Sequence, residues 1–133
     1  MPLQQMWYRS LLIGCSMSNM DEYVLRIGTW KSLQRHKKKH TEKGNGFGYV
    51  LHTEHDTTKT LSARYYKDGG EILISRGEGK LPRKLTGIEC ERLQAFPDNW
   101  TEGLSNTQRY KCLGNAVTTT VVTAILNKLY EEN

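Results

Sequence analysis

The stretch RKLTGIECERLQAFPDNW, residues 83–100, contains the clearest start of a helix in this chain of 133 residues. Thr86 is a favourable N-cap, and Glu89 three residues later completes a capping box, in which each side chain bonds the other residue's backbone N–H. The helix is predicted to run to about Ala95. It should stop before Pro97, because the residue that precedes a proline avoids helical backbone angles.

The segment after this helix, from about residue 108 to residue 130, is predicted to end in a second, amphipathic helix. Its apolar side chains recur at four-residue spacing, which places them on one helical face. If no partner covers it, such a face predicts poor solubility or self-association. The face consists of Val117, Val121, Ile125 and Leu129, with Val122 and Leu126 beside them.

Upstream, residues 60–75 are predicted to form a β-hairpin. Apolar and polar side chains alternate over residues 61–66, as expected of a strand, and Asp-Gly-Gly at residues 68–70 provides the turn. Arg64 could bond a guanine edge bidentately and Ser62 a base or a phosphate. An ordinary hairpin with one exposed arginine explains the same residues.

Residues 30–40, WKSLQRHKKKH, are predicted to form a basic helix, and residues 43–49, KGNGFGY, a glycine loop. The loop neither follows a hydrophobic strand nor opens a helix, which excludes a dinucleotide-binding loop. Beside a basic stretch it suits close approach to a phosphate backbone, although a charge run alone is usually a solvated face. His36 and His40 have metal-ligand spacing, but no third ligand is evident, so no metal site is predicted.

The overall composition is compatible with a polyanionic partner. Lys and Arg number 19 against 14 Asp and Glu, a net charge of +5, and the hydrophobic fraction is 37%. Positive charge suits nucleic acid because Lys and Arg neutralise phosphates. The low hydrophobic fraction fits a small polar domain, and equally a chain that buries part of its surface against a partner.

The cysteines and the apolar runs indicate the compartment. Cys15, Cys90 and Cys112 lie far apart without CxxC spacing, so neither a disulfide framework nor a thiolate zinc site is predicted. No apolar run approaches membrane-spanning length. These features predict a cytoplasmic protein. Residues 1–25 show no clean period and are interpreted as a lead-in of unclear structure.

Residues in a catalytic context are few. No Ser-His-Asp arrangement stands in a recognisable setting, no paired carboxylates mark a pocket, and no cysteine is in an activated environment. Taken by themselves, the residues favour a basic binding module over an enzyme.

Four segments in one order resemble the C-terminal part of bacterial DNA cytosine-5 methyltransferases. Residues 83–100 resemble the ninth of the family's ten ordered motifs, and SNTQRYKCLGNAVTTTVVTAI, residues 105–125, resembles the tenth. TLSARYYKDGGEILI, residues 60–74, is similar to the core of the family's target recognition domain, and KGNGFGY to the recognition loop before it. Several segments in the same order make the resemblance specific.

The resemblance implies an α+β fold. A small target recognition domain with β-hairpins and short helices would occupy residues 26–104, including the ninth motif. Residues 105–133 would hold the tenth-motif segment and a C-terminal helix that docks on an α/β methyltransferase domain not present in this chain. In this family the DNA duplex lies between the two domains, and the target cytosine is flipped out of the stack.

The resemblance also implies which residues would meet double-stranded DNA. Residues 43–49 and 60–68 would be two recognition loops in the major groove. Arg64 would be the leading candidate for a base contact, and Thr60 would lie near the phosphates beside the flipped base. The expected DNA-binding residues are Lys43, Asn45, Phe47, Thr60, Ser62, Arg64 and Tyr65.

The tenth-motif segment would return to the catalytic domain and line the pocket of S-adenosylmethionine, shared with that missing domain. A helix N-terminus beside the pocket would suit the cofactor's carboxylate. The expected cofactor-binding residues are Gly114, Asn115, Ala116 and Val117.

The family's catalytic motifs have no counterpart in this chain. Its Phe-x-Gly-x-Gly cofactor motif, its Glu-Asn-Val motif and its Gln-x-Arg-x-Arg motif are absent, and none of Pro2, Pro82 and Pro97 is followed by a cysteine. No residue is therefore predicted to be catalytic, and the chain is not expected to be active alone.

Three explanations stay open. The chain is the DNA-recognition subunit of a split methyltransferase that a catalytic chain with the Pro-Cys motif completes, or an inactive gene fragment, or a stand-alone DNA-binding module. The presence of both the reading segments and the returning helix favours the split enzyme, because a pure binding module has no use for a cofactor-pocket segment.

Overall fold

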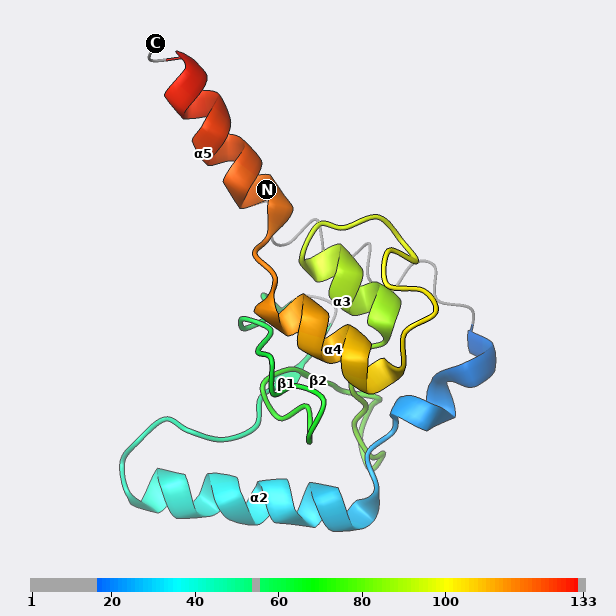
Figure 1. Cartoon of the computed structure of the whole chain (residues 1–133). Coiled ribbons are helices and arrows are strands. Elements are labelled where there is room, and N and C mark those ends of the chain that lie inside the picture. The colour runs from blue at the N-terminus through cyan, green and yellow to red at the C-terminus, as the bar shows by residue number, and fades with distance from the viewer. Residues whose placement is uncertain (1–16, 54–55, 132–133) are drawn as a thin grey trace.

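The computed structural model describes residues 17–53 and 56–131 as a mixed structure of helices and one small sheet. In Figure 1, α2 lies along one end of a body that holds the sheet, α3 and α4, and α5 projects from the other end. The elements in order are η1 (Met17–Tyr23), α2 (Ile27–Glu42), β1 (Leu51–His52), β2 (Leu73–Ile74), α3 (Gly87–Leu93), α4 (Asn106–Asn115) and α5 (Thr119–Glu131).

The two short strands pair in parallel, so the predicted β-hairpin is wrong. Leu51 pairs with Leu73 and His52 with Ile74. Residues 63–68 form turns instead of the first hairpin strand. A parallel pair needs a crossover connection rather than a tight hairpin turn, and the turn-rich segment provides that crossover.

This turn segment buries one side and exposes the other. Leu61 and Tyr65, four residues apart, are both buried, a spacing that matches a helical turn and not the two-residue period of a strand. The predicted turn is confirmed: Asp68 Oδ1 accepts a hydrogen bond from Gly70 N at 3.0 Å, and Gly69 has a φ of 66°. Glycine adopts such left-handed angles without strain.

The capping box predicted at the start of α3 is confirmed. Thr86 Oγ1 accepts from Glu89 N at 3.2 Å, and Glu89 Oε2 accepts from Thr86 N at 2.7 Å. The helix ends at Leu93, earlier than predicted. Ala95 has a left-handed φ of 62°, which a right-handed helix cannot continue.

The C-terminal segment forms two helices where one was predicted. A second capping box, between Ser105 and Gln108, starts α4. Residues 116–118 then separate α4 from α5. The break is held by Gln94, whose backbone oxygen accepts from Thr119 N at 3.0 Å.

Two clusters of buried side chains hold the body together. The smaller one fixes α2 to β2 through Leu25, Leu33 and Leu73. The larger one joins the turn segment, β2, α3 and α4. Its members are Leu61, Tyr65, Ile72, Ile74, Leu85, Cys90, Tyr110 and Leu113.

The residues around η1 contact the body. Lys84 N donates to Tyr23 O at 2.8 Å, and Leu25 N donates to Pro82 O at 3.0 Å. The end of the segment interpreted as a lead-in is therefore built into the fold, while residues 1–16, with Cys15, lie outside the described residues. Within the described ranges, no helix is long and apolar enough to cross a bilayer.

Candidate nucleic-acid interface

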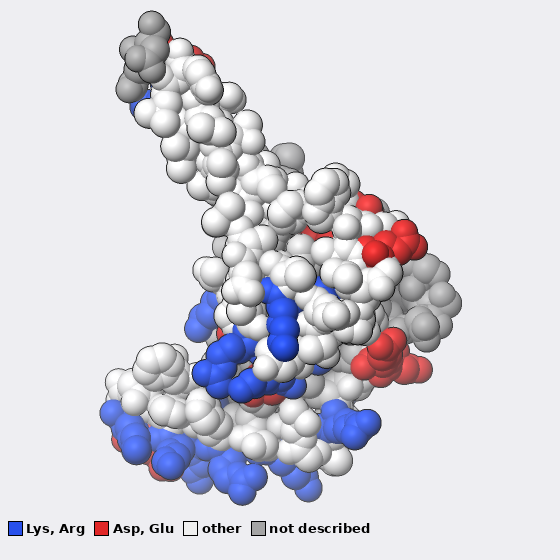
Figure 2. Space-filling model, in the orientation of Figure 1, with Lys and Arg blue, Asp and Glu red and all other residues white. Residues whose placement is uncertain are grey.

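The charges of the chain divide over its surface. Figure 2 shows Lys and Arg gathered over α2 and over the middle of the body, whereas Asp and Glu gather on the flank with η1 and the loop between α3 and α4. The first predicted recognition segment, residues 43–49, follows directly on α2. It therefore lies at the basic end of the molecule, where a polyanion is attracted.

The glycine loop folds back on α2. Gly44 and Gly48 have φ angles of 71° and 143°, which favour glycine. A Cβ atom on Gly48 would lie 2.8 Å from Lys37 Cγ, so the loop backbone packs directly on the helix. Lys37 Nζ also lies 4.4 Å from the centroid of the Tyr49 ring, a cation–π contact. The loop is thus held against α2 as one unit.

His40 positions the tip of this loop. Its Nδ1 lies 2.6 Å from Asn45 Oδ1, and its ring meets the Phe47 ring edge-on with centroids 5.7 Å apart. Lys43, Asn45 and Phe47, the expected contacts of this loop, are all exposed. From the sequence, His40 was weighed only as a metal ligand with His36, and no metal site was predicted. The described residues contain no group of three or more His, Cys, Asp or Glu that could hold a metal ion.

The second predicted recognition segment, residues 60–68, is partly surface and partly core. Thr60 and Arg64 are exposed, so both are accessible to a ligand. Ser62 is half-buried, and its Oγ donates to Glu71 Oε1 at 2.5 Å. This bond engages the hydroxyl within the fold, which leaves Arg64 as the longest accessible hydrogen-bond donor among the predicted residues of this segment.

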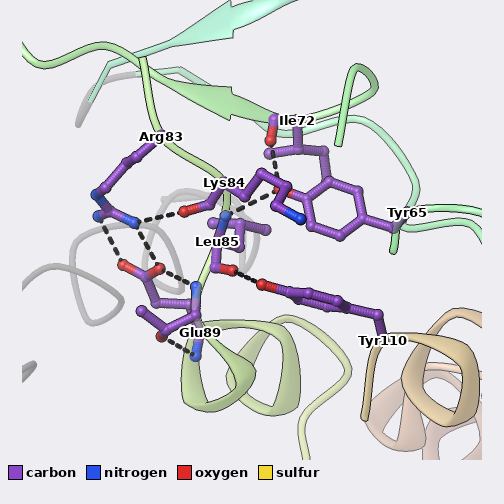
Figure 3. A network of polar contacts seen from close by, with 8 residues as sticks. Tyr65, Ile72, Arg83, Lys84, Leu85, Glu89 and Tyr110 are labelled. Atoms are coloured by element: carbon purple, nitrogen blue, oxygen red, sulfur yellow. Dashed lines mark hydrogen bonds and ion pairs between the residues drawn. The ribbon is translucent and has the colours of Figure 1, made fainter. Parts of the chain in front are cut away.

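Tyr65 is buried, which corrects its prediction as a DNA contact. Its hydroxyl donates to Ile72 O at 2.5 Å and accepts from Leu85 N at 2.9 Å, as Figure 3 shows. Burial raises the pKa of Tyr65 well above its usual value, so the hydroxyl keeps its proton. The residue holds the turn segment onto the core instead of facing solvent.

The two segments are joined at their inner ends. Val50, directly after the glycine loop, donates from its N to Gly70 O at 3.1 Å. Val50 O accepts from Leu73 N at 3.0 Å. The inner ends of the two segments thus meet at the pair of strands β1 and β2. This strand pair fixes the position of one segment relative to the other.

A buried polar network supports the turn segment (Figure 3). Arg83 Nη1 and Nη2 donate to the two carboxylate oxygens of Glu89 at 2.8 and 2.9 Å. Bidentate pairs of this kind fix the geometry of both side chains. Leu85, between them in sequence, bonds Tyr65 through its N and Tyr110 of α4 through its O, the latter at 2.5 Å. The segment of residues 83–89 therefore connects the turn segment to α4.

A second buried carboxylate, that of Glu91, ties the loop after α3 to α4. It accepts from Asn99 N at 2.7 Å, Thr101 N at 2.8 Å and Arg109 Nη2 at 2.9 Å. Burial raises the pKa of this carboxyl, but the bonds from Thr101 and Arg109 outweigh burial and hold the pKa below its usual value. A Cβ atom on Gly87 would overlap the Arg109 guanidinium, so a larger residue at the start of α3 would displace Arg109 from this contact.

Neither buried carboxylate was predicted from the sequence. Glu89 was assigned only to a capping box, and Glu91 to no role. The sequence offers only a weak indication of these pairs. Two glutamates lie on one short helix, Arg83 precedes it, and Arg109 follows Glu89 by twenty residues. A charged side chain is seldom fully buried unless it is paired, and the pairing depends on contacts that the sequence does not display.

The four residues predicted to line a cofactor pocket differ in their surroundings. Asn115 and Val117 are exposed, and Ala116 is half-buried. Gly114 packs on the turn segment, because a Cβ atom there would overlap the Ser62 carbonyl group. Gly114 therefore fixes α4 against a predicted recognition segment, a role that sequence analysis did not assign.

α5 exposes its apolar face, as predicted for the chain without a partner. The helix is described along its whole length and buries none of its side chains. Val121 and Ile125 are each 56% exposed, and Leu129 is 54% exposed. Contiguous exposed apolar surface of this kind marks an interaction site.

The two cysteines that the structure describes differ in accessibility. Cys90 is fully buried, and burial raises the pKa of its thiol well above the usual value. The thiolate is the nucleophilic form of cysteine, so Cys90 is unsuited to attack a base. Cys112 is exposed on α4 and is not paired in a disulfide.

Comparison with known proteins identifies the family. Residues 9–131 match the family described as C-5 cytosine-specific DNA methylase, and the chain belongs to this family. The family that the ordered motifs predicted is thereby confirmed.

The chain is similar to only a part of its curated relatives. It is 46% identical over 112 residues to the Type II methyltransferase M1.ScrFI of Lactococcus lactis subsp. cremoris, which covers 84% of this chain and 28% of the relative. It is 46% identical over 110 residues to the Type II methyltransferase M.SsoII of Shigella sonnei, covering 82% and 29% respectively. The chain thus spans less than a third of the length of these relatives.

The fold also resembles a part of a solved methyltransferase. The structure of the S. pombe Dnmt2 methyltransferase superimposes with a TM-score of 0.71 over 94% of this chain and 42% of that chain, at 14% sequence identity. At this identity the likeness shows the fold alone.

Proposed function

We propose that this chain is the DNA-recognition part of a DNA cytosine-5 methyltransferase, and that a second polypeptide with the catalytic motifs completes it. The observation that carries the proposal is the contact of Gly114 with Ser62. It fixes the segment proposed to return to the cofactor to the segment proposed to read DNA. A stand-alone DNA-binding module has no need of that coupling.

Recognition of duplex DNA is assigned to the exposed side chains of the two joined segments. Arg64 presents a guanidinium that matches the acceptors of a guanine edge in the major groove. Lys43 and Asn45 of the glycine loop are exposed beside the basic helix, and Thr60 is exposed at the start of the turn segment. The similar proteins named as Type II methyltransferases support a sequence-specific role.

S-adenosylmethionine is proposed as the cofactor, since it is the methyl donor of this family. Three of the four predicted residues fit the wall of a cofactor pocket that is shared with a catalytic domain. Asn115 and Val117 are exposed and Ala116 half-buried, so all three can meet a second domain. Gly114 does not fit as a ligand contact on its Ser62 side, because that side is filled by the turn segment. When bound, the cofactor would supply the methyl group transferred to carbon 5 of cytosine.

The nucleophilic cysteine that attacks carbon 6 of the base is assigned to the completing chain. Cys90 is excluded by its burial and its raised thiol pKa. The exposed apolar face of α5 supports the need for a partner, because a catalytic domain would cover Val121, Ile125 and Leu129.

Transfer of labelled methyl groups from S-adenosylmethionine to bacterial DNA tests this proposal. The chain is assayed alone and together with a co-expressed chain that bears the Pro-Cys motif, and Arg64→Ala is the matched variant. Activity only in the mixture, with loss of sequence preference in the variant, supports the proposal. Activity of the chain alone contradicts it. A folded chain that binds DNA but never supports methylation would favour the stand-alone module.

A further inference from the structure

α2 has two chemically distinct faces. Its inner face holds the helix on the body: Leu33 is buried against β2, and the rings of Trp30 and Tyr49 meet with centroids 4.6 Å apart. Lys37 lies on this side too, over the Tyr49 ring. The helix is therefore a fixed part of the fold and presents a constant outer surface.

The outer face of α2 is a row of cations. Its members recur at four, seven and eight residues from the first, which places them on one side of a helix. The row is about 12 Å long, because a helix rises about 1.5 Å per residue. None of the ion pairs found among the described residues includes any member of the row. The four exposed members are Lys31, Arg35, Lys38 and Lys39.

An ordinary solvated helix face mixes charges of both signs in similar numbers, whereas this face carries four cations and one anion. Lys31 and Arg35, and again Arg35 and Lys39, are like charges four residues apart, an arrangement that destabilises a helix. The one anion is Glu42, which follows Lys38 by four residues at the last position of α2 and offsets only the end of the row. A bound polyanion would relieve this repulsion, whereas water alone only screens it.

The place of this face in the molecule favours DNA as that polyanion. The helix leads directly into the glycine loop, and Asn45 N donates to His40 O at 3.2 Å, so the row and the loop form one rigid unit. α2 also lies at the end of the body opposite α5 (Figure 1). A chain that docks on α5 therefore leaves the row accessible, and the surface over α2 is basic in Figure 2.

We propose that the outer face of α2 binds the phosphate backbone of duplex DNA beside the sequence that the two loops read. The inference rests on the proposed function, in which duplex DNA is the substrate. The row matches the axial rise of about three to four phosphates on one strand, since these are spaced by about 3.4 Å along the duplex axis. Phosphate contacts of this kind set position and affinity but carry no sequence information.

Salt-dependent binding of the full chain to a 30-base-pair duplex of random sequence tests the proposal. The variant K31Q/K38Q/K39Q is compared with the control R76Q/K80Q/K128Q, which removes the same number of exposed charges elsewhere. Each neutralised phosphate contributes about 0.9 to the slope of log K against log salt. The slope should therefore fall by about 2.7 in the α2 variant and by less than about 1 in the control. Unchanged circular dichroism spectra and cooperative urea transitions verify that both variants fold.

Two results would overturn the inference. Equal slopes in the two variants would mean that net charge, and not the α2 face, attracts DNA. No binding of the unmodified chain to duplex would exclude the face as a DNA contact. The methyl-transfer assay separates this inference from the proposed function. If the paired chains methylate DNA but the salt slope of the α2 variant is unchanged, only the inference is overturned. If the salt slope of the α2 variant falls but no methylation occurs, only the enzymatic role is overturned.

Discussion

Replacing Glu89 by Gln should lower the free energy of unfolding far more than is usual for a residue on a short helix. Glu89 is fully buried and has two roles. Its Oε2 accepts from the N-cap backbone at Thr86, and both of its carboxylate oxygens accept from Arg83. Glutamine keeps the length of the side chain and one acceptor oxygen, so the capping bond survives. The bidentate ion pair does not, and the buried Arg83 guanidinium loses the carboxylate that accepts from both of its Nη atoms.

The expected loss of unfolding free energy follows from treating the cap and the ion pair separately. Removing one partner of a buried ion pair costs about 3–5 kcal/mol, because the remaining charge is uncompensated. Loss of a capping side chain alone costs about 1 kcal/mol. Thr86→Ala is thus the matched control, since it removes the cap and leaves the ion pair. A domain with a free energy of unfolding of about 5–15 kcal/mol would lose a large share of its stability in Glu89→Gln.

The assay is urea unfolding followed by circular dichroism at 222 nm, with a double-mutant cycle between Glu89→Gln and Arg83→Met. Each single variant removes one side of the Arg83–Glu89 pair, so the double variant should cost less than the sum of the two single ones. The reasoning is refuted if Glu89→Gln destabilises the chain no more than Thr86→Ala. It is equally refuted if the costs of the two single variants simply add.

Three further predictions concern the segments around the candidate interface. Gly114→Ala should lower the free energy of unfolding by about 1–3 kcal/mol, because its Cβ overlaps the Ser62 carbonyl; a loss below about 0.5 kcal/mol in urea would show that the contact adapts freely. His40→Ala should speed amide hydrogen exchange at Asn45 while leaving the urea midpoint nearly unchanged, and unaltered exchange would contradict the positioning role. Burial lowers the pKa of His52, so the unfolded chain binds the proton more readily. The free energy of unfolding should therefore decline as the pH falls below about 6.5, the pKa of histidine in the unfolded chain. If a His52→Gln variant shows the same pH dependence, His52 is not its cause.

Features set by neighbouring residues could be predicted from the sequence. The capping box of Thr86 and Glu89 involves groups three residues apart, so its hydrogen bonds need no information from the rest of the fold. The turn at residues 68–70 depends on glycine backbone angles and on one Asx side chain. The basic helix and the glycine loop after it were also predicted, because both depend on residues that are close in sequence. The ordered motifs identified the family, because their sequence order needs no coordinates.

Features set by distant residues could not be predicted in this way. The alternation over residues 61–66 suggested a strand, but the pairing of Leu51 with Leu73 is parallel, and the turn segment buries Tyr65 instead of exposing it. His40 was weighed as a metal ligand, and only the folded loop shows its bond to Asn45.

The sequence by itself determined the start of α3, the turn at residues 68–70, and the basic and apolar faces of the helices, since each follows from residues close to one another in the chain. The order of the motifs along the chain determined the family. Only the tertiary structure decided that Glu89 pairs with Arg83, that Gly114 contacts Ser62, and that Tyr65 belongs to the core. The physical reason is that burial and ion pairing depend on which segments meet in space. A carboxylate, a glycine or a tyrosine has the same local propensity whether or not a distant segment covers it.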